Sequence, residues 1–289
     1  MLLRCVRSVL KATRPALTKV IIVDNCSSDS SIEALRWAFP GIDVIESPEN
    51  LGYSRGNNLG ANHLLRIGCS FLLFVNPDVE LGVDTAELFM RAAVEDPSVG
   101  CVGGVAVEPG GTLVPGCRNR PTTWQKVLLY SPFRRAAFFR GLRARHEISY
   151  VELSEVAEVY TVSGACVMFR GEAFCGVGGF DPKTFLYEEE FIMAERLRAG
   201  GWRTVCVKGA QYRHVCGHAT DQRLLRKRFF FIESEQHLLT QYYGWTRPSA
   251  LLLRMYRYAE WPSYVLAAAC ARLRGSSPKR QARLGSPSA

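Results

Sequence analysis

The stretch FLLFVNPD (Phe71–Asp78) decides the fold. Its five apolar residues predict a strand buried on both faces, and Asn76, Pro77 and Asp78 end it with turn-forming residues. The same rules predict further elements along the first quarter of the chain. The predicted strands are 19–23, 42–46 and 71–75, and the predicted helices are 2–10, 31–38 and 57–67. This alternation predicts an α/β fold with a mostly parallel sheet and flanking helices.

Polar residues follow each of these strands. Asp24 and Asp78 come directly after the strands at 19–23 and 71–75, and a glycine-rich loop, 50–58, follows the strand at 42–46. A single Asp at a strand end is usually a turn former. Ligands in such sheets, however, bind beyond the carboxyl ends of the strands. The convergence of three polar groups at one edge therefore favours a binding site.

The remaining elements are less regular. A helix over 84–95, a strand over 99–107 and a strand over 159–169 interrupted at 163–165 are predicted, with irregular structure over 109–158. A glycine-dense turn at 176–181 precedes a helix that runs to about residue 199, and a strand at 204–207 leads towards His214.

Three chemical groups stand out in these elements. Glu188, Glu189 and Glu190 open a helix, where negative charge is stabilised by the helix dipole, so capping alone could explain one of them. Three adjacent carboxylates raise one another's pKa, which suits a general base. Asp78 is a hard oxygen ligand that suits Mg²⁺ or Mn²⁺, and His214 on its own is either a core histidine or a metal ligand.

Taken in order, the motifs resemble those of the family 2 glycosyltransferases, in particular the bacterial rhamnosyltransferase-like branch. The resemblance covers about residues 1–220. The motifs are Val23-Asp24-Asn25-x-Ser27-x-Asp29, Glu49-Asn50-x-Gly52-Tyr53-x-x-Gly56-Asn57-Asn58, Asn76-Pro77-Asp78, Ser163-Gly164-Ala165-Cys166, Gly178-Gly179-Phe180-Asp181, Phe185-Leu186-Tyr187-Glu188-Glu189-Glu190 and Arg196-Leu197.

The resemblance implies a GT-A fold and inverting transfer of a sugar from a nucleotide-diphosphate sugar, with Mg²⁺ or Mn²⁺ as the cofactor. It assigns Glu190 as the general base, with Glu189 as the first acid of the pair, and it assigns Asp78 and His214 to the metal. The residues that it implies for the nucleotide-sugar are Asp24, Asn25, Asn50, Gly52, Arg55, Asn57 and Asn76.

Two features depart from the family pattern. The base position carries Glu where Asp is commoner, which lengthens the reach to the acceptor by one methylene. The family also begins with a strand ending in a Thr-Tyr-Asn-like motif, whereas Met1 already lies in the helix that should follow it. We therefore expect a chain that is truncated at its N-terminus or has a misassigned start. Loss of a central strand would expose the ladder edges of its neighbours and impair folding or activity.

Charge divides the chain into two parts. Residues 1–221 balance 24 basic against 24 acidic residues, whereas residues 222–289 hold 12 basic and 3 acidic residues, so the whole net charge of +9 lies there. We expect a domain over 1–221, a basic amphipathic helical extension over 222–274 and a disordered tail over 275–289. The extension mixes basic, aromatic and aliphatic residues, which suits an anionic membrane surface, although a solvated basic tail is the simpler alternative.

Further features of the sequence bear on its sites and its cellular location. No apolar run approaches the roughly 20 residues of a spanning helix. Ten scattered cysteines form no CxxC pair, and the sequence has no P-loop, GxGxxG after a strand or GxSxG. We expect a cytoplasmic protein, peripheral on the inner face of the plasma membrane.

The function expected is transfer of a sugar from dTDP-rhamnose or a UDP-hexose to a hydroxyl of a cell-surface polysaccharide or lipid-linked glycan. The alternative is an inactive GT-A-like scaffold that binds nucleotide or partners. Nucleic acid is not an expected partner, because no known nucleic-acid-binding module is visible.

Overall fold

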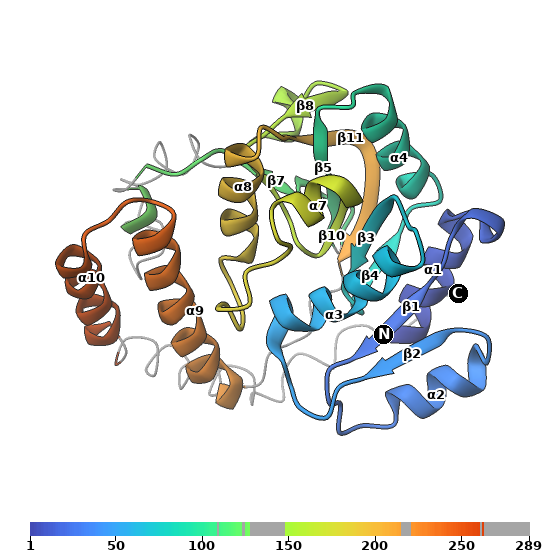
Figure 1. The fold of residues 1–289 in the computed structure, drawn as a ribbon, viewed down its shortest axis with the longest axis horizontal. Coiled ribbons are helices and arrows are strands. Elements are labelled where there is room, and N and C mark those ends of the chain that lie inside the picture. Colours follow the sequence, from blue (N-terminus) through green and yellow to red (C-terminus); the bar gives the residue numbers. More distant parts are fainter. Residues whose placement is uncertain (109, 123–124, 128–147, 215–220, 261, 263–289) are drawn as a thin grey trace, which may run out of the picture.

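The computed structural model describes residues 1–108, 110–122, 125–127, 148–214, 221–260 and 262 (Figure 1). The helices are α1 (Leu2–Ala12), α2 (Ser31–Ala38), α3 (Gly52–Arg66), α4 (Thr85–Glu95), α7 (Gly171–Gly176), α8 (Glu189–Ala199), α9 (Asp221–Gln241) and α10 (Arg247–Ala259), with 3₁₀ turns η1 (Pro15–Leu17) and η4 (Tyr150–Glu152). The strands are β1 (Ile21–Asp24), β2 (Asp43–Glu46), β3 (Phe71–Val75), β4 (Val79–Leu81), β5 (Val99–Val107), β6 (Leu113–Pro115), β7 (Cys117–Arg118), β8 (Val156–Glu158), β9 (Thr161–Val162), β10 (Cys166–Arg170) and β11 (Arg203–His214).

A seven-stranded sheet forms the centre of the molecule. Its main order is β3-β10-β5-β11-β4, with β6 paired to β5 and β8 paired to β11. Strand β10 runs antiparallel to both of its neighbours, and β5 and β11 are parallel, so β3, β5 and β11 all point the same way. The α/β class predicted from the sequence is therefore confirmed.

Strands β1 and β2 form a separate parallel pair, in register from Ile21 opposite Asp43 to Asp24 opposite Glu46. Together with α2 they lie beside the large sheet, at the lower right of Figure 1. Within the described residues β1 pairs only with β2, and on the main path of the large sheet β3 pairs only with β10. Each of these two strands therefore has one edge without a ladder partner in that part of the chain.

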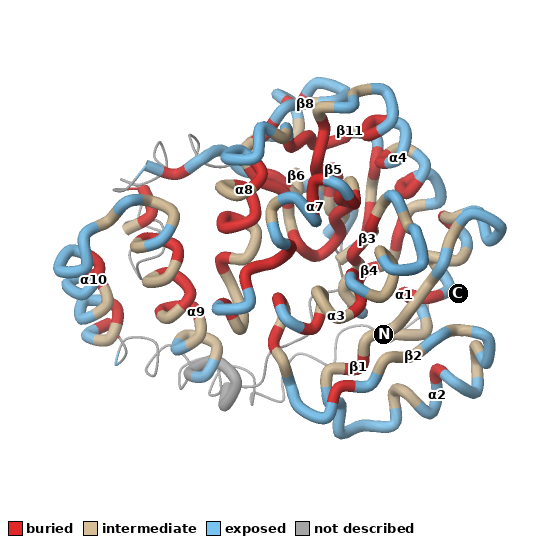
Figure 2. The backbone as a smooth tube through the Cα atoms, viewed as in Figure 1, coloured by how far each residue is buried: buried red, intermediate tan, exposed pale blue. Residues whose placement is uncertain are grey.

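The core lies on both faces of the large sheet, because successive side chains of a strand point to opposite faces. On one face, Leu72 and Phe74 of β3 pack in a cluster that also includes residues of α3, α7 and α8. On the other face, Leu73 and Val75 pack beside residues of α1 and α4, among them the fully buried Phe89. Figure 2 shows the buried residues concentrated along these strands and the inward sides of the helices. Buried strands with helices on both faces explain the apolar runs in the sequence.

Two elements differ in extent from the sequence expectations. Helix α3 begins at Gly52 rather than near residue 57, so the glycine-rich segment forms the first turns of a helix instead of a loop. Strand β11 extends to His214 rather than ending at residue 207, because its far end pairs with β4 and β5. The break expected at 163–165 is confirmed, since these residues separate β9 from β10.

The C-terminal helices pack on the rest of the molecule. Ser234 of α9 donates a hydrogen bond of 2.9 Å to the carbonyl of Leu186, and His237 contacts the carboxylate of Asp181 at 2.8 Å. The expected helical extension over 222–274 is helical as far as Ala259 among the described residues. The expected disordered tail, 275–289, lies outside the described residues. The domain boundary at residue 221 stays a prediction.

Candidate active site

Asparagines hold together the segments that follow β1 and β2. The side-chain amide of Asn25 donates to the carbonyl of Gly52 at 2.9 Å and to Oδ1 of Asn50 at 3.3 Å, and its own Oδ1 accepts from the amide of Leu51 at 2.7 Å. Oδ1 of Asn50 accepts from the amide of Gly52 at 3.0 Å. These bonds satisfy backbone groups that the start of a helix leaves open, which explains why α3 begins early.

Gly52 is required at the start of α3. Its φ is +75°, and a Cβ there would lie 2.3 Å from the carbonyl oxygen of Phe185. The next residue, Tyr53, donates its amide to that same carbonyl at 2.7 Å. The expected nucleotide segment is thus fixed against the turn that leads into the glutamates.

Asp78 and His214, which the family resemblance assigns to one metal site, lie next to each other. Strand β4 pairs with the end of β11 so that His214 stands opposite Val79, which places Nε2 of His214 3.3 Å from Oδ2 of Asp78. The hydrogen bond to His214 lowers the pKa of Asp78, and the same bond raises the pKa of His214. Both side chains are partly exposed, so a ligand can reach them.

The Asp78–His214 pair fits a divalent cation that keeps open coordination positions. A carboxylate and an imidazole suit Mn²⁺, and Mg²⁺ usually takes one or two carboxylates and completes its shell with water and phosphate oxygens. The described residues contain no group of three or more His, Cys, Asp or Glu side chains that could hold a metal by itself. The pair would therefore supply two ligands, and a diphosphate would supply others.

The loop between β9 and β10 joins the parts of the site. The amide of Asn76, which precedes Asp78, donates to the carbonyl of Ala165 at 2.9 Å. The hydroxyl of Tyr53 donates to the carbonyl of Gly164 at 2.7 Å. The amide of Gly164 in turn donates to Oε1 of Glu190 at 2.6 Å. One short loop therefore connects the expected metal, nucleotide and base residues.

The two candidate acids have different environments. The Glu190 carboxylate accepts the Gly164 bond and has a guanidinium nitrogen of Arg118 3.9 Å from its other oxygen, with 26% of its side chain exposed. In contrast, burial and the nearby charge of Glu190 raise the pKa of Glu189 to about 8, and its Oε2 atom is buried without a hydrogen-bond partner. Burial therefore favours the protonated form of Glu189, whereas Glu190 is the more accessible of the two carboxylates.

Glu188 anchors the turn before these residues. Both of its oxygens accept bonds from Nζ of Lys126, at 2.7 and 2.6 Å, and the two side chains are almost fully buried. Tyr187 and Glu188 have φ values of 72° and 65°, a left-handed conformation that is unfavourable for residues with a Cβ. The Lys126 contact holds this turn in place immediately before Glu189 and Glu190.

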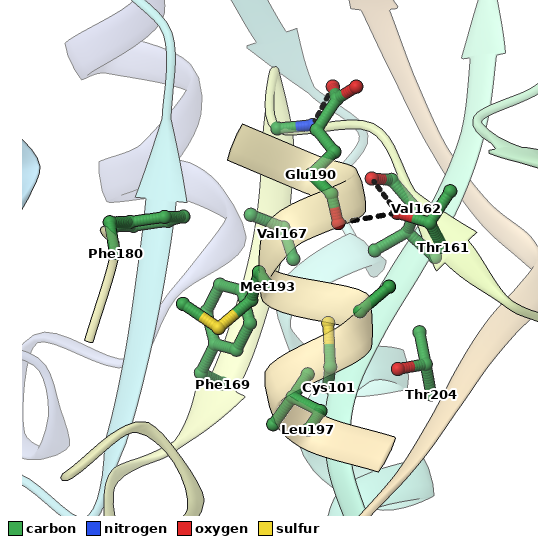
Figure 3. Close-up of a pocket in the computed structure, with 12 residues that line it drawn as sticks. Cys101, Thr161, Val162, Val167, Phe169, Phe180, Glu190, Met193, Leu197 and Thr204 are labelled. Atoms are coloured by element: carbon green, nitrogen blue, oxygen red, sulfur yellow. Dashed lines mark hydrogen bonds between the residues drawn. The ribbon is translucent and has the colours of Figure 1, made fainter. Parts of the chain in front are cut away.

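A cavity of about 20 Å³ lies behind Glu190 (Figure 3). Glu190 is the charged residue of its lining, and Phe169, Met193 and Leu197 are among the apolar side chains beyond it. This volume holds about one water molecule, so the cavity is too small for a sugar. The side of Glu190 that faces this cavity is therefore lined mostly by apolar side chains.

Three of the expected nucleotide residues have local roles in the structure. Asp24 is buried and its Oδ1 accepts the amide of Ser27 at 3.1 Å, as a turn former does. Asn57 bonds the carbonyl of Tyr53 within α3, and Arg55 lies 3.6 Å from Glu49 at the exposed rim. Their contribution to nucleotide binding stays a prediction.

Sequence reasoning did not find Lys126 or Arg118. Lys126 lies in the stretch 109–158, where no periodicity marked any position as buried, and Arg118 lies on the two-residue strand β7. Tyr53 lay within a recognised motif, but only the fold shows that its hydroxyl reaches Gly164. Burial raises the pKa of Tyr53, so this hydroxyl stays a donor.

Comparison with known proteins identifies the family of the chain. The model of Glycosyl transferase family 2 matches residues 1–152, just over half of the chain. The chain is 28% identical over 222 residues to the N-acetylglucosaminyl-diphospho-decaprenol L-rhamnosyltransferase of Mycobacterium tuberculosis, covering 73% of this chain and 70% of that relative. It is also 28% identical over 214 residues to the O-antigen biosynthesis protein RfbC of Myxococcus xanthus, covering 72% of this chain but 16% of that much longer protein.

Solved structures share the fold. The mannosyltransferase PcManGT from Pyrobaculum calidifontis, in complex with GDP-Man and Mn²⁺, superposes with a TM-score of 0.55 at 17% identity, over 96% of this chain and 77% of that one. GalNAc-T7, with UDP, GalNAc and Mn²⁺, gives a TM-score of 0.53 at 15% identity, over 74% of this chain and 40% of that one. With the strand-end site described above, these matches show that the chain belongs to glycosyl transferase family 2 and is a glycosyltransferase with a GT-A fold.

Proposed function

We propose that this chain transfers a sugar, with inversion at the anomeric carbon, from a nucleoside-diphosphate sugar to a hydroxyl of a lipid-linked or cell-surface glycan. The observation that carries the proposal is the Glu190 carboxylate, held at 2.6 Å by the Gly164 amide in the loop that also bonds Tyr53 and the segment of Asp78. A fixed carboxylate beside the expected donor site is what single-displacement transfer requires.

In the proposed reaction Glu190 takes the proton of the acceptor hydroxyl. The oxygen forms a bond to the anomeric carbon as the bond from that carbon to the diphosphate oxygen breaks, and the nucleoside diphosphate leaves with the electron pair. Inversion follows from one in-line displacement. The Gly164 amide aims the carboxylate, and the protonated Glu189 avoids a second negative charge beside it.

Asp78 and His214 would hold the divalent ion, Mg²⁺ or Mn²⁺, and a bound ion would supply positive charge to the departing diphosphate. Asn25 and Asn50 fix the start of α3 through their hydrogen bonds, and in the proposal their side chains border the nucleotide-sugar. Mn²⁺ in the two structural neighbours supports this metal assignment.

For the donor and acceptor, the most informative comparison is the mycobacterial relative, whose name describes rhamnose transfer to N-acetylglucosaminyl-diphospho-decaprenol. We therefore favour dTDP-rhamnose as the donor, with a UDP-hexose as the second choice, and a polyprenyl-diphosphate-linked sugar as the acceptor. Purified chain, Mn²⁺ and a polyprenyl-diphosphate N-acetylglucosamine would be incubated with each donor in turn.

Mass spectrometry of the lipid product identifies the sugar by its mass increment. We expect a deoxyhexose increment with dTDP-rhamnose. A product formed equally with every nucleotide-sugar, or no product with any of them while the folded chain binds nucleoside diphosphate, would overturn the donor and acceptor assignment. The latter result would support the inactive nucleotide-binding scaffold instead.

A further inference from the structure

Helix α10 is amphipathic in an unusual sense, because its outer face is apolar and its inner face carries charge. Leu251, Leu252 and Met255 are exposed, with 68% of Leu252 and 61% of Met255 open to solvent. Their spacing places them along one stripe of the helix. The stripe forms the outer face of α10, and no described part of the chain covers it.

Ion pairs with α9 fix this orientation. Arg257 of α10 is fully buried and binds both oxygens of Glu235 at 2.9 Å. Next to it, Glu260 accepts from Arg228 of α9 at 2.7 Å and lies 3.7 Å from Arg257 itself. Removing a charge from such a buried pair is strongly destabilising, so α10 cannot roll over to bury its leucines. The apolar stripe is thus held outwards by the charged inner face.

The described residues of this region, 226–260, carry excess positive charge. Residues 222–289 contain three acidic residues, and each of them is paired with an arginine: Glu233 with Arg254, Glu235 with Arg257 and Glu260 with Arg228. Six basic residues lie among the described residues 226–260, against these three acidic ones. Helix α10 is also the outermost element on its side of the molecule, with α9 between it and α8 (Figures 1 and 2). The surface therefore combines exposed apolar side chains with excess positive charge.

We propose that the outer face of α10 inserts into the headgroup region of an anionic lipid bilayer. Apolar side chains on one face, with basic residues around them, are the features by which interfacial helices bind such membranes. No helix among the described residues is long and apolar enough to cross a membrane, and α10 has 13 residues. The proposal concerns contact of α10 with the surface of the bilayer.

A second copy of the chain fits this face of α10 less well than a lipid surface does. Thirteen helical residues extend about 20 Å, and the three exposed apolar side chains on them supply much less than the ~800 Å² per partner of a stable interface. Two copies would also bring like charges together. The lipid surface, being negative, attracts the same charges.

The proposal extends the proposed transfer by placing the protein on the membrane, and α10 is linked to the site. Arg257 donates to the carbonyl of Lys126 at 3.2 Å, and the side chain of Lys126 binds Glu188. Membrane contact by α10 would thus hold the base-bearing end of α8 close to a lipid-linked acceptor.

The test measures binding of the full chain to vesicles, without donor or acceptor. Vesicles of phosphatidylcholine with phosphatidylglycerol would be compared with phosphatidylcholine alone by co-sedimentation, at low and high salt. The test variant is Leu252→Gln with Met255→Gln. The matched control is Trp37→Gln on α2, which removes an apolar side chain that is 89% exposed but lies far from α10 in sequence and on another helix.

We expect the wild type and the control to bind anionic vesicles, less at high salt, and the double variant to bind at least about tenfold more weakly. Circular dichroism checks that the double variant is folded. Unchanged binding of the folded variant would overturn the proposal. An equal loss of vesicle binding in the Trp37→Gln control would also overturn it. A third contrary result would be a wild-type dimer, measured by sedimentation, that is absent in the double variant. None of these outcomes depends on transfer activity, so the proposal fails or stands separately from the proposed function.

Discussion

Lys126 and Glu188 form a buried ion pair on which the turn before the base depends. Lys126 is fully buried, and Glu188 is 6% exposed. Changing Lys126→Met leaves the Glu188 carboxylate buried without its two bonds of 2.6 and 2.7 Å. Breaking one side of a buried pair lowers the free energy of unfolding by about 3–5 kcal/mol. We expect this loss at pH 7, together with a lower transfer rate, because Glu189 and Glu190 follow the strained turn.

Equilibrium denaturation in urea measures the free energy of unfolding. The double variant Lys126→Met with Glu188→Gln tests whether the effect belongs to the pair, because it removes the uncompensated carboxylate. It should lose less than the sum of the two single variants, with a coupling energy of at least about 2 kcal/mol. The matched control is Arg254→Met, whose partner Glu233 belongs to a partly exposed pair, for which the expected loss is at most about 1 kcal/mol. A loss no larger for Lys126→Met than for the control would refute the reasoning.

Two further predictions concern pH. Burial acts to raise the pKa of Asp181, but hydrogen bonds from His237 and Tyr242 lower it to about 2. The ionised carboxylate therefore contributes about 2 kcal/mol to the free energy of unfolding, which is present above pH 3.8 and lost as the pH falls towards 2. Acid unfolding of Asp181→Asn should show a smaller loss of stability over that range, and curves identical to the wild type would contradict the assignment. The raised pKa of Glu189, about 8, predicts a pH dependence of the opposite sign, because stability is lost as the pH rises. The free energy of unfolding of the wild type should fall by roughly 3–5 kcal/mol between pH 4.5 and 8, and Glu189→Gln should remove that fall. Denaturation at several pH values checks this, and a variant that keeps the wild-type slope would show that the fall has another source.

The sequence indicated the strands and the groups at their ends because these depend on local patterns. Apolar runs and turn residues predicted β1, β3 and the positions of Asp24 and Asp78. The proximity of Asp78 and His214 came from the family resemblance, and the structure explains it through the pairing of β4 with β11. That pairing joins segments more than 130 residues apart, so no local pattern could reveal it.

Other parts of the site depend on contacts that leave no local signal. The early start of α3 requires Asn25, which lies in a different turn and bonds Leu51 across the sheet edge. Lys126 is a lone basic residue within an irregular stretch, and only the fold shows that it is buried against Glu188. The basic composition of the C-terminal part predicted a helical extension. It could not show that Arg257 points inwards while Leu252 points outwards.

The central claim is that Glu190, not Glu189, is the base that deprotonates the acceptor. The most direct measurement is kcat for sugar transfer by Glu190→Gln and Glu189→Gln, each with saturating donor and Mn²⁺, and with binding of the nucleoside diphosphate measured alongside. The account predicts a fall in kcat of about 10²–10⁴-fold for Glu190→Gln with nucleotide binding retained, and a smaller effect for Glu189→Gln, which keeps the neutral charge of the protonated acid. Wild-type kcat in Glu190→Gln, or a larger loss in Glu189→Gln, would contradict it.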